Sequence, residues 1–441
     1  MTRILIAGGG YVGLFVALGL EKKLSAGGLG RTQDRRDHEI TMVAPDSYMT
    51  YQPFLPEAAS GNIEPRHVVV PLRRALKKTR LVTARVIGLD HPARTATIRP
   101  GEGPDQTLAY DHVVLGLGSV SRVLDVPGLA DNAVGFTSVE EAIYLRNRVL
   151  SRLDIAEAMT DAAAKRKALT FTFVGGGYSG IEALAELEDL ARDATRYYRG
   201  ISPEDMKWVL IEAASTILPE VGDDLAAYAL EHLRHRGIDV RLETRLESAV
   251  DGHLVLSDGT EFDTDTLVWT TGVIANPVLR TFGFPTDARG RIVVDETLRV
   301  PGHPGAWAAG DGARVPDLTT GRPAPPTAQH ALREARRLAR NLVADLSGTP
   351  MKPFKYRNKG GLVSLGRYKG VARILGMRVK GFPAWFLHRT YHVFMLPGIN
   401  RKFRVLADWT VALFFRRDIV QLGSLQHPRS PFEAAARPRA K

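Results

Sequence analysis

The chain has 441 residues, of which 44% are hydrophobic and 24% charged, and this length suggests about three domains of roughly 150 residues. It contains no cysteine, which excludes disulfides, thiolate zinc sites, iron–sulfur clusters and catalysis through a cysteine or a dithiol. The formal net charge is +11, from 59 basic and 48 acidic side chains.

The positive charge is concentrated at the C-terminal end of the chain. Residues 351–441 contain 19 Lys and Arg and 3 Asp and Glu, a net charge of +16, so residues 1–350 carry 40 basic and 45 acidic side chains, a net charge of −5. The same segment holds 13 of the 33 aromatic residues. A basic and aromatic segment on an acidic body predicts a surface for membrane phosphates or nucleic acid, and the lack of a nucleic-acid-binding motif favours the membrane.

The first long apolar run, Ile4–Leu20, has no charged residue and follows Arg3, as in a signal peptide or a membrane-spanning helix. Its three consecutive glycines would interrupt such a helix but suit the turn between a strand and a helix. No other run approaches the length of a spanning helix. The sequence therefore predicts a protein without a transmembrane segment.

Two parts of the chain repeat the same order of apolar strand, glycine-rich turn, apolar helix and second strand. They are residues 3–43 and residues 169–211, and their turns are Gly8–Gly13 and Gly175–Gly180. Such βαβ units bind dinucleotides. The duplication predicts an α/β fold with two Rossmann-like dinucleotide-binding domains.

Both turns follow the pattern G-x-G-x-x-G. The first glycine makes the turn, the second lets the backbone approach a pyrophosphate, and the third lets the helix pack closely on the strand. The helix N-terminus adds amide groups and the positive end of its dipole. One such turn is weak evidence, but two copies, each between an apolar strand and an apolar helix, indicate two nucleotide sites. The glycines of the pattern are Gly8, Gly10, Gly13, Gly175, Gly177 and Gly180.

The residue after the second strand distinguishes the two sites. Glu212 follows the strand 208–211, where a carboxylate accepts hydrogen bonds from both hydroxyls of an adenosine ribose and repels a 2′-phosphate. This predicts NADH rather than NADPH at the second site. The matching position of the first site is Ala44, with Asp46 two residues further on, so the usual ribose contact is missing or displaced there.

Two further features follow the second unit. Gly310-Asp311 comes after an apolar strand, on a turn that would hold a cofactor phosphate or ribityl chain. A helix is predicted over residues 327–346, because apolar residues recur at helical spacing on one side and arginines fill the other. Its apolar stripe is Leu332, Ala335, Leu338, Ala339, Leu342, Val343 and Leu346.

This arrangement resembles the two-dinucleotide-binding-domain flavoproteins, which bind FAD on the first unit and a nicotinamide nucleotide on the second. Within them the chain is similar to the type II NADH dehydrogenases, which are single-subunit NADH:quinone oxidoreductases. The resemblance covers nearly the whole length. It rests on Tyr51–Leu55 with Ala59–Gly61, Val174–Glu182, Trp269–Ala275, Gly310-Asp311, Thr327–Gln329, and Gly361–Arg367 through Trp385.

The resemblance implies which residues bind the two cofactors. The set for FAD is Gly8, Gly10, Gly13, Gly310 and Asp311, and the set for NADH is Gly175, Gly177, Gly180, Glu212 and Gly272. No metal site is expected.

The resemblance also implies two catalytic residues, Glu182 and Gln329. Glu182 matches an acid placed near the nicotinamide; the alternative is a first-turn glutamate favoured by the helix dipole. Ala328 and Gln329 match the quinone-site signature, in which Gln329 would donate a hydrogen bond to a quinone carbonyl. The third residue of this site is Arg333, which stands where the family commonly has a second glutamine.

Three regions follow from these assignments: a discontinuous FAD-binding domain (residues 1–155 and 285–350), an NADH-binding domain (165–284) and a basic, aromatic membrane-surface region (351–441). Within the last, residues 382–417 combine aromatic rings with cations, as do helices lying on a membrane. A core or homodimer helix and a nucleic-acid patch are the alternatives for this region. The residues concerned are Trp385, Phe386, Tyr391, Phe394, Trp409, Phe414, Phe415, Arg389, Arg401, Lys402, Arg404, Arg416 and Arg417.

The expected function is that of a peripheral flavoenzyme on the cytoplasmic face of the cell membrane. A hydride would pass from NADH to FAD and two electrons from FAD to a quinone, without proton pumping. The absence of cysteine sets aside the thiol-dependent relatives of this architecture. The alternatives are a soluble FAD-dependent NADH reductase of a ferredoxin, a rubredoxin or a small oxidant, and a nucleotide-sensing flavoprotein.

Overall fold

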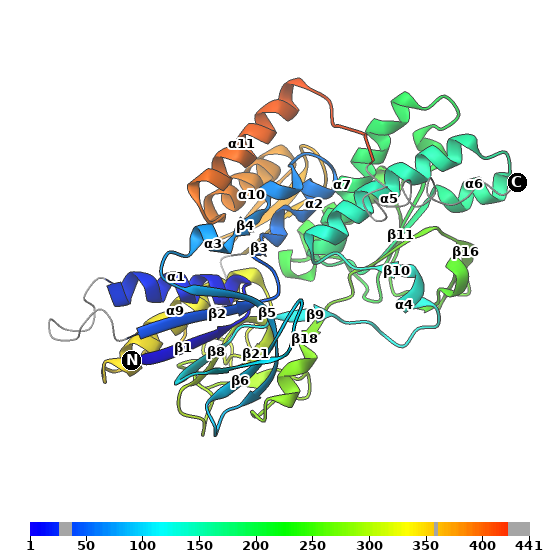
Figure 1. The fold of residues 1–441 in the computed structure, drawn as a ribbon. Helices are drawn as coiled ribbons and strands as arrows, with labels where there is room; N and C mark the ends of the chain where they lie inside the picture. The colour runs from blue at the N-terminus through cyan, green and yellow to red at the C-terminus, as the bar shows by residue number, and fades with distance from the viewer. Residues whose placement is uncertain (26–37, 357–359, 422–441) are drawn as a thin grey trace, which may run out of the picture. The chain divides into compact units, whose positions relative to one another are not determined.

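The computed structural model describes residues 1–25, 38–356 and 360–421. The chain forms two compact units, and each is assembled from separate segments (Figure 1). Each unit contains one of the two predicted dinucleotide-binding folds. Unit 1 comprises Met1–Tyr51, Val69–Arg122 and Gly272–Asn358, and unit 2 comprises Gln52–Val68, Val123–Thr271 and Lys359–Lys441.

Unit 1 is built on a seven-stranded sheet of order β20-β8-β1-β2-β5-β6-β7. The pairs from β20 to β5 are parallel, as in a Rossmann fold, and β6 and β7 continue the sheet antiparallel. The strands are β1 (Thr2–Ala7), β2 (His38–Ala44), β5 (Arg80–Asp90), β6 (Thr95–Pro100), β7 (Gln106–Ala109), β8 (His112–Leu115) and β20 (Ala306–Ala308).

Two helices pack against each other in unit 1, α1 (Tyr11–Ser25) and α9 (Ala328–Leu346). A Cβ added to Gly19 of α1 would lie 2.7 Å from the Ala339 Cβ, so a larger residue would push the helices apart. The predicted apolar stripe of α9 is buried from Leu332 to Val343, and the helix begins one residue later than expected. The apolar run Ile4–Leu20 is therefore a strand, a turn and a buried helix.

The remaining elements of unit 1 are short. They are β3 (Tyr48–Thr50), β4 (Val69–Pro71), α3 (Leu72–Ala75), β9 (Ser119–Ser121), β18 (Val273–Ala275), η7 (Pro277–Thr281), β19 (Ile292–Val293), η8 (Gly310–Gly312) and β21 (Ala313–Arg314).

Unit 2 contains a five-stranded parallel sheet of order β10-β17-β11-β12-β13. Apolar side chains of its central strands form a core with an antiparallel sheet, in which β15 and β16 form a hairpin around residues 257–260. The parallel strands are β10 (Ala133–Val134), β11 (Thr170–Val174), β12 (Lys207–Ile211), β13 (Asp239–Arg241) and β17 (Thr266–Trp269), and the antiparallel ones β14 (Leu246–Ser248), β15 (His253–Leu256) and β16 (Glu261–Asp263).

The central helix of unit 2 is α7 (Tyr178–Ala194), which follows the second glycine turn. It packs on α2 (Leu55–Ala59) and on α5 (Val139–Ala158), whose first turn is fixed by a Ser138–Glu141 capping box. The other helices are η1 (Gln52–Phe54), η2 (Pro65–His67), α4 (Leu129–Asn132), α6 (Ala162–Ala168), η3 (Thr195–Tyr197), η4 (Pro203–Asp205), η5 (Pro219–Val221), α8 (Asp223–His235) and η6 (Val250–Gly252).

The C-terminal region belongs to unit 2 from residue 359 onward. Its three antiparallel strands are β22 (Gly360–Ser364), β23 (Gly370–Ile374) and β24 (Met377–Lys380), and its two helices are α10 (Phe382–Met395) and α11 (Ile399–Phe414). β22 packs on α7, and α10 packs on all three strands. Arg389 of α10 and the Trp409 indole of α11 both bond the buried carboxylate of Glu57 on α2, the indole at 2.7 Å. Since a buried charge must be compensated, these bonds fasten the region to the unit.

The compact units divide the chain differently from the predicted domains. Residues 52–68 and 123–155, expected beside the first glycine turn, belong to unit 2, and residues 272–284 belong to unit 1. Of the C-terminal residues expected as a separate region, 351–358 belong to unit 1 and 359–441 to unit 2. The reason is that α2 and α5 bury apolar faces against α7, and the sequence pattern does not show which sheet such a face covers.

Not all of the aromatic and basic residues expected at a surface face the solvent. Trp385 is buried, and so is Arg417, whose guanidinium lies 3.8 Å from the Glu186 carboxylate. Arg389 points inward to Glu57. The composition gives the number of aromatic and basic residues but not the direction in which their side chains point.

Within the described residues, no helix is long and apolar enough to cross a bilayer.

Candidate active site

The glycine turn of unit 1 has the geometry that a nucleotide phosphate needs. Gly8 has a positive φ of 108°, and a Cβ there would overlap the carbonyl oxygen of Gly116. A Cβ on Gly13 would overlap the carbonyl oxygen of Gly8, whereas one on Gly10 would meet nothing within 4 Å. Only glycine fits at the crowded positions, and the backbone at Gly10 is open for a ligand at the start of α1.

The predicted Gly310-Asp311 turn lies against this glycine turn. Gly310 has a φ of +73°, and a Cβ there would come within 2.7 Å of the Val12 side chain in the first turn of α1. Asp311 accepts a hydrogen bond from the Ser119 hydroxyl at 2.8 Å, and burial raises the pKa of its carboxyl. The structure thus brings Gly8, Gly13, Gly310 and Asp311 together within unit 1.

A glutamate that the sequence analysis did not single out holds the same turn. The Gly310 N–H donates to the Glu334 carboxylate at 2.7 Å, and Glu334 is buried on α9. Burial raises the pKa of this carboxyl to about 7, against the opposing effect of the Gly310 hydrogen bond. Glu334 lies on the apolar stripe of α9, one turn before Leu338. An acid at such a position in the sequence indicates a buried carboxyl group.

The end of β2 carries an alanine, Ala44, where the second site has Glu212. Ala44 is buried beneath the turn, and a Cβ on Gly9 would lie only 2.7 Å from the Ala44 Cβ. Asp46 is exposed beyond the end of the strand.

The glycine turn of unit 2 repeats the geometry of the first. Gly175 has a φ of +114°, and a Cβ there would lie 2.8 Å from the Thr270 carbonyl. A Cβ on Gly180 would overlap the Gly175 carbonyl oxygen, and one on Gly177 would meet nothing within 4 Å. The Thr270 hydroxyl fixes the turn by donating to the Val174 carbonyl oxygen at 2.9 Å.

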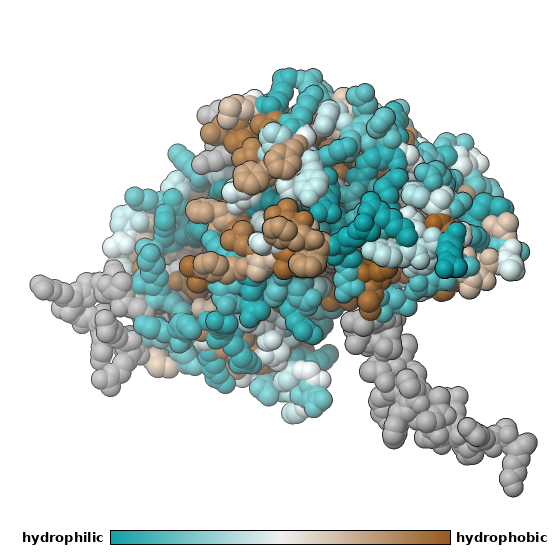
Figure 2. All heavy atoms as spheres, turned by 90° about the horizontal axis from the view of Figure 1, so that it is seen from above, coloured by the Kyte–Doolittle hydropathy of each residue, from teal (hydrophilic) through white to brown (hydrophobic). Residues whose placement is uncertain are grey.

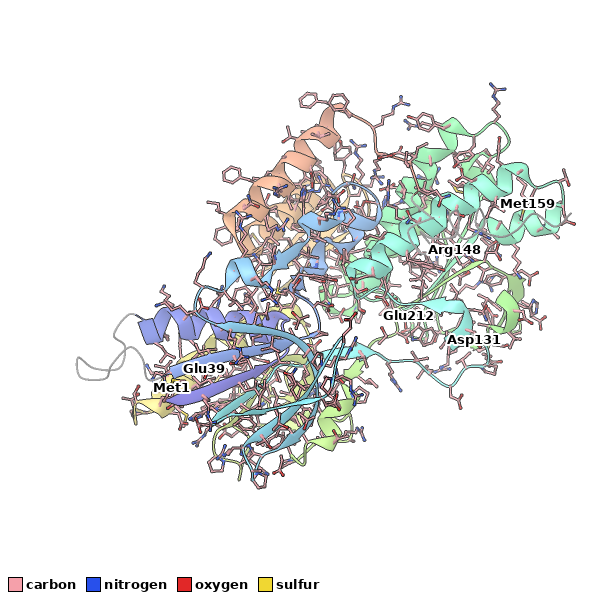
Figure 3. All side chains as sticks on the ribbon, in the orientation of Figure 1. Met1, Glu39, Asp131, Arg148, Met159 and Glu212 are labelled. Atoms are coloured by element: carbon pink, nitrogen blue, oxygen red, sulfur yellow. The ribbon has the colours of Figure 1, made fainter. Side chains whose placement is uncertain are left out.

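Glu212 occupies the predicted position at the carboxyl end of β12 (Figure 3). Its two carboxylate oxygens accept hydrogen bonds from the Gly176 N–H at 2.5 Å and from the Ala214 N–H at 2.8 Å. The carboxylate is therefore oriented by the glycine turn itself. Gly272, the fifth residue expected at this site, has a φ of +104° and lies in unit 1, where its carbonyl oxygen accepts from the Arg122 N–H.

Glu182 is buried in the second turn of α7, and its contacts differ from those of a glutamate held only by the helix dipole. One carboxylate oxygen accepts from the Ser364 N–H at 2.8 Å and lies 3.0 Å from the His388 Nε2. Both partners come from the C-terminal region, and the local sequence around Glu182 contains no sign of them.

The quinone-site signature begins α9. Thr327 caps the helix, and the Gln329 side-chain oxygen accepts from the Tyr356 hydroxyl at 2.9 Å. Arg333 donates to the Gln329 carbonyl oxygen at 2.8 Å, and its guanidinium lies 4.3 Å above the Tyr356 ring. Tyr356 is thus a member of this cluster that the sequence analysis missed. Ala328 starts the helix one turn before Ala331, whose Cβ is 3.6 Å from where a Gly310 Cβ would lie.

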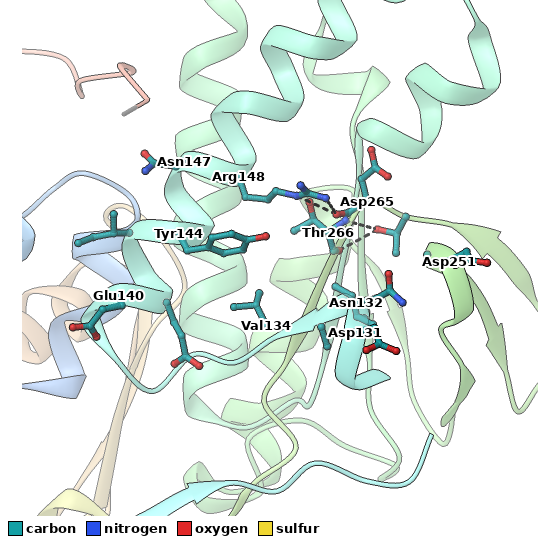
Figure 4. Close-up of a pocket in the computed structure, with 16 residues that line it drawn as sticks. Asp131, Asn132, Val134, Glu140, Tyr144, Asn147, Arg148, Asp251, Asp265 and Thr266 are labelled. Carbon is teal, nitrogen blue, oxygen red and sulfur yellow. Dashed lines mark hydrogen bonds between the residues drawn. The ribbon is translucent and has the colours of Figure 1, made fainter. Parts of the chain in front are cut away.

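A separate cavity of about 730 Å³ lies in unit 2 beside α5 and β17 (Figure 4). Tyr144 and Arg148 of α5 line it, and Arg148 donates to the carbonyl oxygen of Asp265. None of its lining residues is a predicted site residue.

A sequence model of the pyridine nucleotide-disulphide oxidoreductase family matches residues 2–335. A type II NADH:quinone oxidoreductase of Staphylococcus epidermidis is 30% identical over 414 residues, which cover 91% of this chain and 98% of that protein. The chain belongs to the type II NADH:quinone oxidoreductases.

Other proteins similar to this chain are also type II enzymes. A type II NADH:quinone oxidoreductase of Mycobacterium tuberculosis is 29% identical over 94% of this chain and 89% of its own length. The solved structure of NDH2 from Plasmodium falciparum in complex with NADH has the same fold, with a TM-score of 0.86, 18% identity, and coverage of 95% of this chain and 99% of that one. The wider family is named for disulphide chemistry, but this type II member contains no cysteine.

For the NADH site of this type II enzyme, we expect Glu212→Gln to raise the KM for NADH roughly tenfold and to increase the use of NADPH. A neutral amide loses charge-assisted hydrogen bonds and no longer repels a 2′-phosphate. Steady-state kinetics with both nucleotides check this. The exposed Glu247→Gln on β14 is the matched control, and an unchanged ratio of NADH to NADPH use in Glu212→Gln would contradict the assignment.

The raised pKa of Glu334 predicts a pH-dependent stability. Because the folded pKa of about 7 exceeds the ordinary 4.5, the stabilisation is complete below pH 4.5 and is lost as the pH rises to 7. Over that range the unfolding free energy of the wild type should fall by on the order of 3 kcal/mol relative to Glu334→Gln.

Thermal unfolding of the FAD-loaded protein at several pH values measures this difference. The exposed Glu231→Gln on α8 is the control and should follow the wild type. Parallel pH profiles for the wild type and Glu334→Gln would show that the Glu334 carboxyl is not perturbed.

Proposed function

We propose that the chain is an FAD-dependent, non-proton-pumping NADH:quinone oxidoreductase that works on a membrane surface. The observation that supports the proposal most directly is the pair of glycine turns, the first beside Gly310-Asp311 and the second beside Glu212, in a chain that covers 98% of a type II relative. The overall reaction is NADH + H⁺ + quinone → NAD⁺ + quinol. The cofactors are FAD and NADH.

The residues of each unit would hold one nucleotide. In unit 2, the amides at Gly175–Gly177 and the start of α7 would bind the NADH pyrophosphate, and Glu212 its ribose. In unit 1, the open backbone at Gly10 would receive the FAD pyrophosphate, and Asp311, held by Ser119, would bind the chain next to it. When bound, FAD accepts a hydride from NADH and passes two electrons to the quinone.

At the acceptor site, Gln329 would orient the quinone. Its side-chain oxygen accepts a hydrogen bond from the Tyr356 hydroxyl. This contact fixes the orientation of the amide, so that its NH₂ group would donate a hydrogen bond to a quinone carbonyl. Arg333, in place of a second glutamine, adds a cation stacked on Tyr356 and favours a developing negative charge on the quinone.

The outward face of α10 and α11 supports a lipid surface as the partner. α11 buries only Val405 completely, and its exposed residues are mostly large and apolar. Figure 2 shows brown, apolar side chains gathered among teal, polar ones on the face that carries these helices. The exposed residues are Phe382, Phe386, Leu387, Phe394, Ile399, Phe403, Leu406, Val411, Leu413, Phe414 and Phe415.

The charge of this face selects an anionic surface. Asp408 is the only acid within residues 382–417, and His67 and the Glu64 N–H bind its carboxylate at 2.5 Å and 3.1 Å. Arg404 and Arg416 are exposed next to the apolar residues. Aromatic rings at headgroup level with neighbouring cations are typical of monotopic helices. The cytoplasmic leaflet carries the anionic lipids, so we propose that face of the membrane.

The function itself is tested by turnover of the detergent-purified, yellow protein with a short-chain quinone. We expect NADH to be preferred to NADPH, and Gln329→Ala to lose quinone turnover while ferricyanide, a soluble one-electron acceptor, is still reduced. The exposed Gln106→Ala on β7 is the control. A colourless protein, or ferricyanide reduction without quinone reduction in the wild type, would contradict the proposal.

The surface is tested by point substitutions, because deleting residues after Gly381 also removes Arg389 and Trp409 from Glu57. We expect the triple variant Phe403→Ser, Phe414→Ser, Phe415→Ser to bind phosphatidylglycerol vesicles roughly a hundredfold more weakly, at about 1 kcal/mol for each ring. Co-sedimentation measures this.

A matched control replaces three exposed apolar residues elsewhere, Val123, Tyr197 and Val250, by serine and should bind like the wild type. Sedimentation velocity on the same proteins distinguishes a second copy from lipid. If the triple variant dissociates a dimer and leaves vesicle binding intact, the face is a homodimer contact and not a membrane surface.

A further inference from the structure

The cavity beside α5 and β17 lies at the opposite end of the parallel sheet of unit 2 from the nucleotide turn. Thr266 and Leu267, the first two residues of β17, line it, whereas the turn Gly175–Gly180 follows the carboxyl end of the neighbouring strand β11. Nucleotides bind at the carboxyl ends of such strands. With a volume of about 730 Å³, the cavity has the size of a small-molecule site and lies apart from the proposed NADH site.

One polar side chain of the cavity is buried without a partner. Thr266 is 3% exposed, and its hydroxyl forms no hydrogen bond within the described residues. The next residue, Leu267, packs in the core with the antiparallel sheet, so Thr266 points to the other face of the parallel sheet, where α5 lines the cavity. A buried hydroxyl without a partner costs free energy, because it has lost its hydrogen bonds with water. A ligand in the cavity would restore such a bond.

Arg148 of α5 provides a cation on the same side of the cavity as Thr266 (Figure 4). Its Nε and Nη2 donate to the Asp265 carbonyl oxygen, which fixes the guanidinium, while the Asp265 carboxylate is paired with Arg152. The Nη1 group keeps two N–H donors for a ligand. A guanidinium and a hydroxyl side by side suit a carboxylate.

The other side of the cavity is acidic. Figure 4 shows Asp131 of α4 across the cavity from Arg148. Asp131 and Asp251 are exposed, and neither carboxylate has an ion pair within the part of the chain that the structure describes. Lys167 donates to the Asp251 carbonyl oxygen and not to its carboxylate. Two unpaired carboxylates at the rim suit an ammonium group.

The remaining wall of the cavity is partly apolar, with Val134, Ile143, Tyr144 and Leu267 in its lining. Taken as a sphere, the cavity is about 11 Å across, and an extended chain advances about 3.3–3.6 Å per residue, so a peptide of two or three residues spans it. A single amino acid does not, because its ammonium and carboxylate groups are attached to one carbon.

We propose that this cavity binds a short apolar peptide in its zwitterionic form. The peptide carboxylate would accept hydrogen bonds from the Arg148 Nη1 and from the Thr266 hydroxyl. The ammonium group would lie against Asp131 and Asp251, and the apolar side chains would cover the Tyr144 ring. The inference does not depend on the proposed function, because binding is measured without turnover.

Isothermal titration calorimetry of the FAD-loaded protein with trileucine tests the inference. We expect the wild type to bind trileucine, and to bind three analogues roughly tenfold or more weakly. They are leucine, whose charges are on one carbon, N-acetyltrileucine, which has no ammonium group, and trileucine amide, which has no carboxylate. Equal affinity for trileucine and for both blocked peptides would overturn the inference.

Thr266→Val separates ligand binding from a structural role. Valine has the shape of threonine without the hydroxyl, and because that hydroxyl has no partner, the variant should unfold at the wild-type temperature or above it. Trileucine should nevertheless bind roughly tenfold more weakly.

Arg148→Gln tests the carboxylate end of the peptide. It should weaken the binding of trileucine roughly tenfold or more and that of trileucine amide much less, because the amide has no carboxylate to lose. The matched control is Arg234→Gln on α8, an exposed arginine that also donates to a backbone carbonyl oxygen, that of Val240. If Arg148→Gln does not fold, Thr266→Val decides.

Two further results would overturn the inference. One is a wild type that does not bind trileucine at millimolar concentration. The other is wild-type affinity in both Thr266→Val and Arg148→Gln, because the peptide would then bind elsewhere on the chain.

Discussion

Buried carboxylates on α7 have to be surrounded by donors, and the C-terminal region supplies many of them. Glu182 is satisfied by Ser364 and His388, and Glu186 by the Ser364 hydroxyl and Arg417. Removing an ionised group from water costs several kcal/mol unless such partners are present. The C-terminal region therefore helps to stabilise α7, the helix that follows the second glycine turn.

The C-terminal region has two different faces, one turned toward α2 and α7 and one exposed. The inner face carries ion pairs and hydrogen bonds to α2 and α7, including Arg389 with Glu57. The outer face of α11 presents apolar rings and almost no acid. One segment thus connects the buried carboxylates of unit 2 with an exposed apolar surface.

The sequence predicted the features that depend on neighbouring residues. The two strand–turn–helix units and the apolar stripe of α9 were located to within a few residues, because glycine spacing and helical periodicity are local signals. Contacts between distant segments were not predictable in this way. Nothing near Glu182 indicates His388, and the cations Arg389 and Arg417 were expected at the surface because their number, not their direction, is visible in a sequence. The burial of Glu334 could have been predicted from the sequence, since this acid stands within the apolar stripe of α9.

The division of each unit among separate segments has a consequence for the order in which the protein is made. When residues 1–271 have left the ribosome, every strand of the parallel sheet in unit 2 has been synthesised, whereas unit 1 still lacks β20 and α9. Until α9 emerges, the face of α1 that carries Gly19 lacks the helix against which it packs. The second dinucleotide fold, although encoded later, can therefore form its sheet before the first one does.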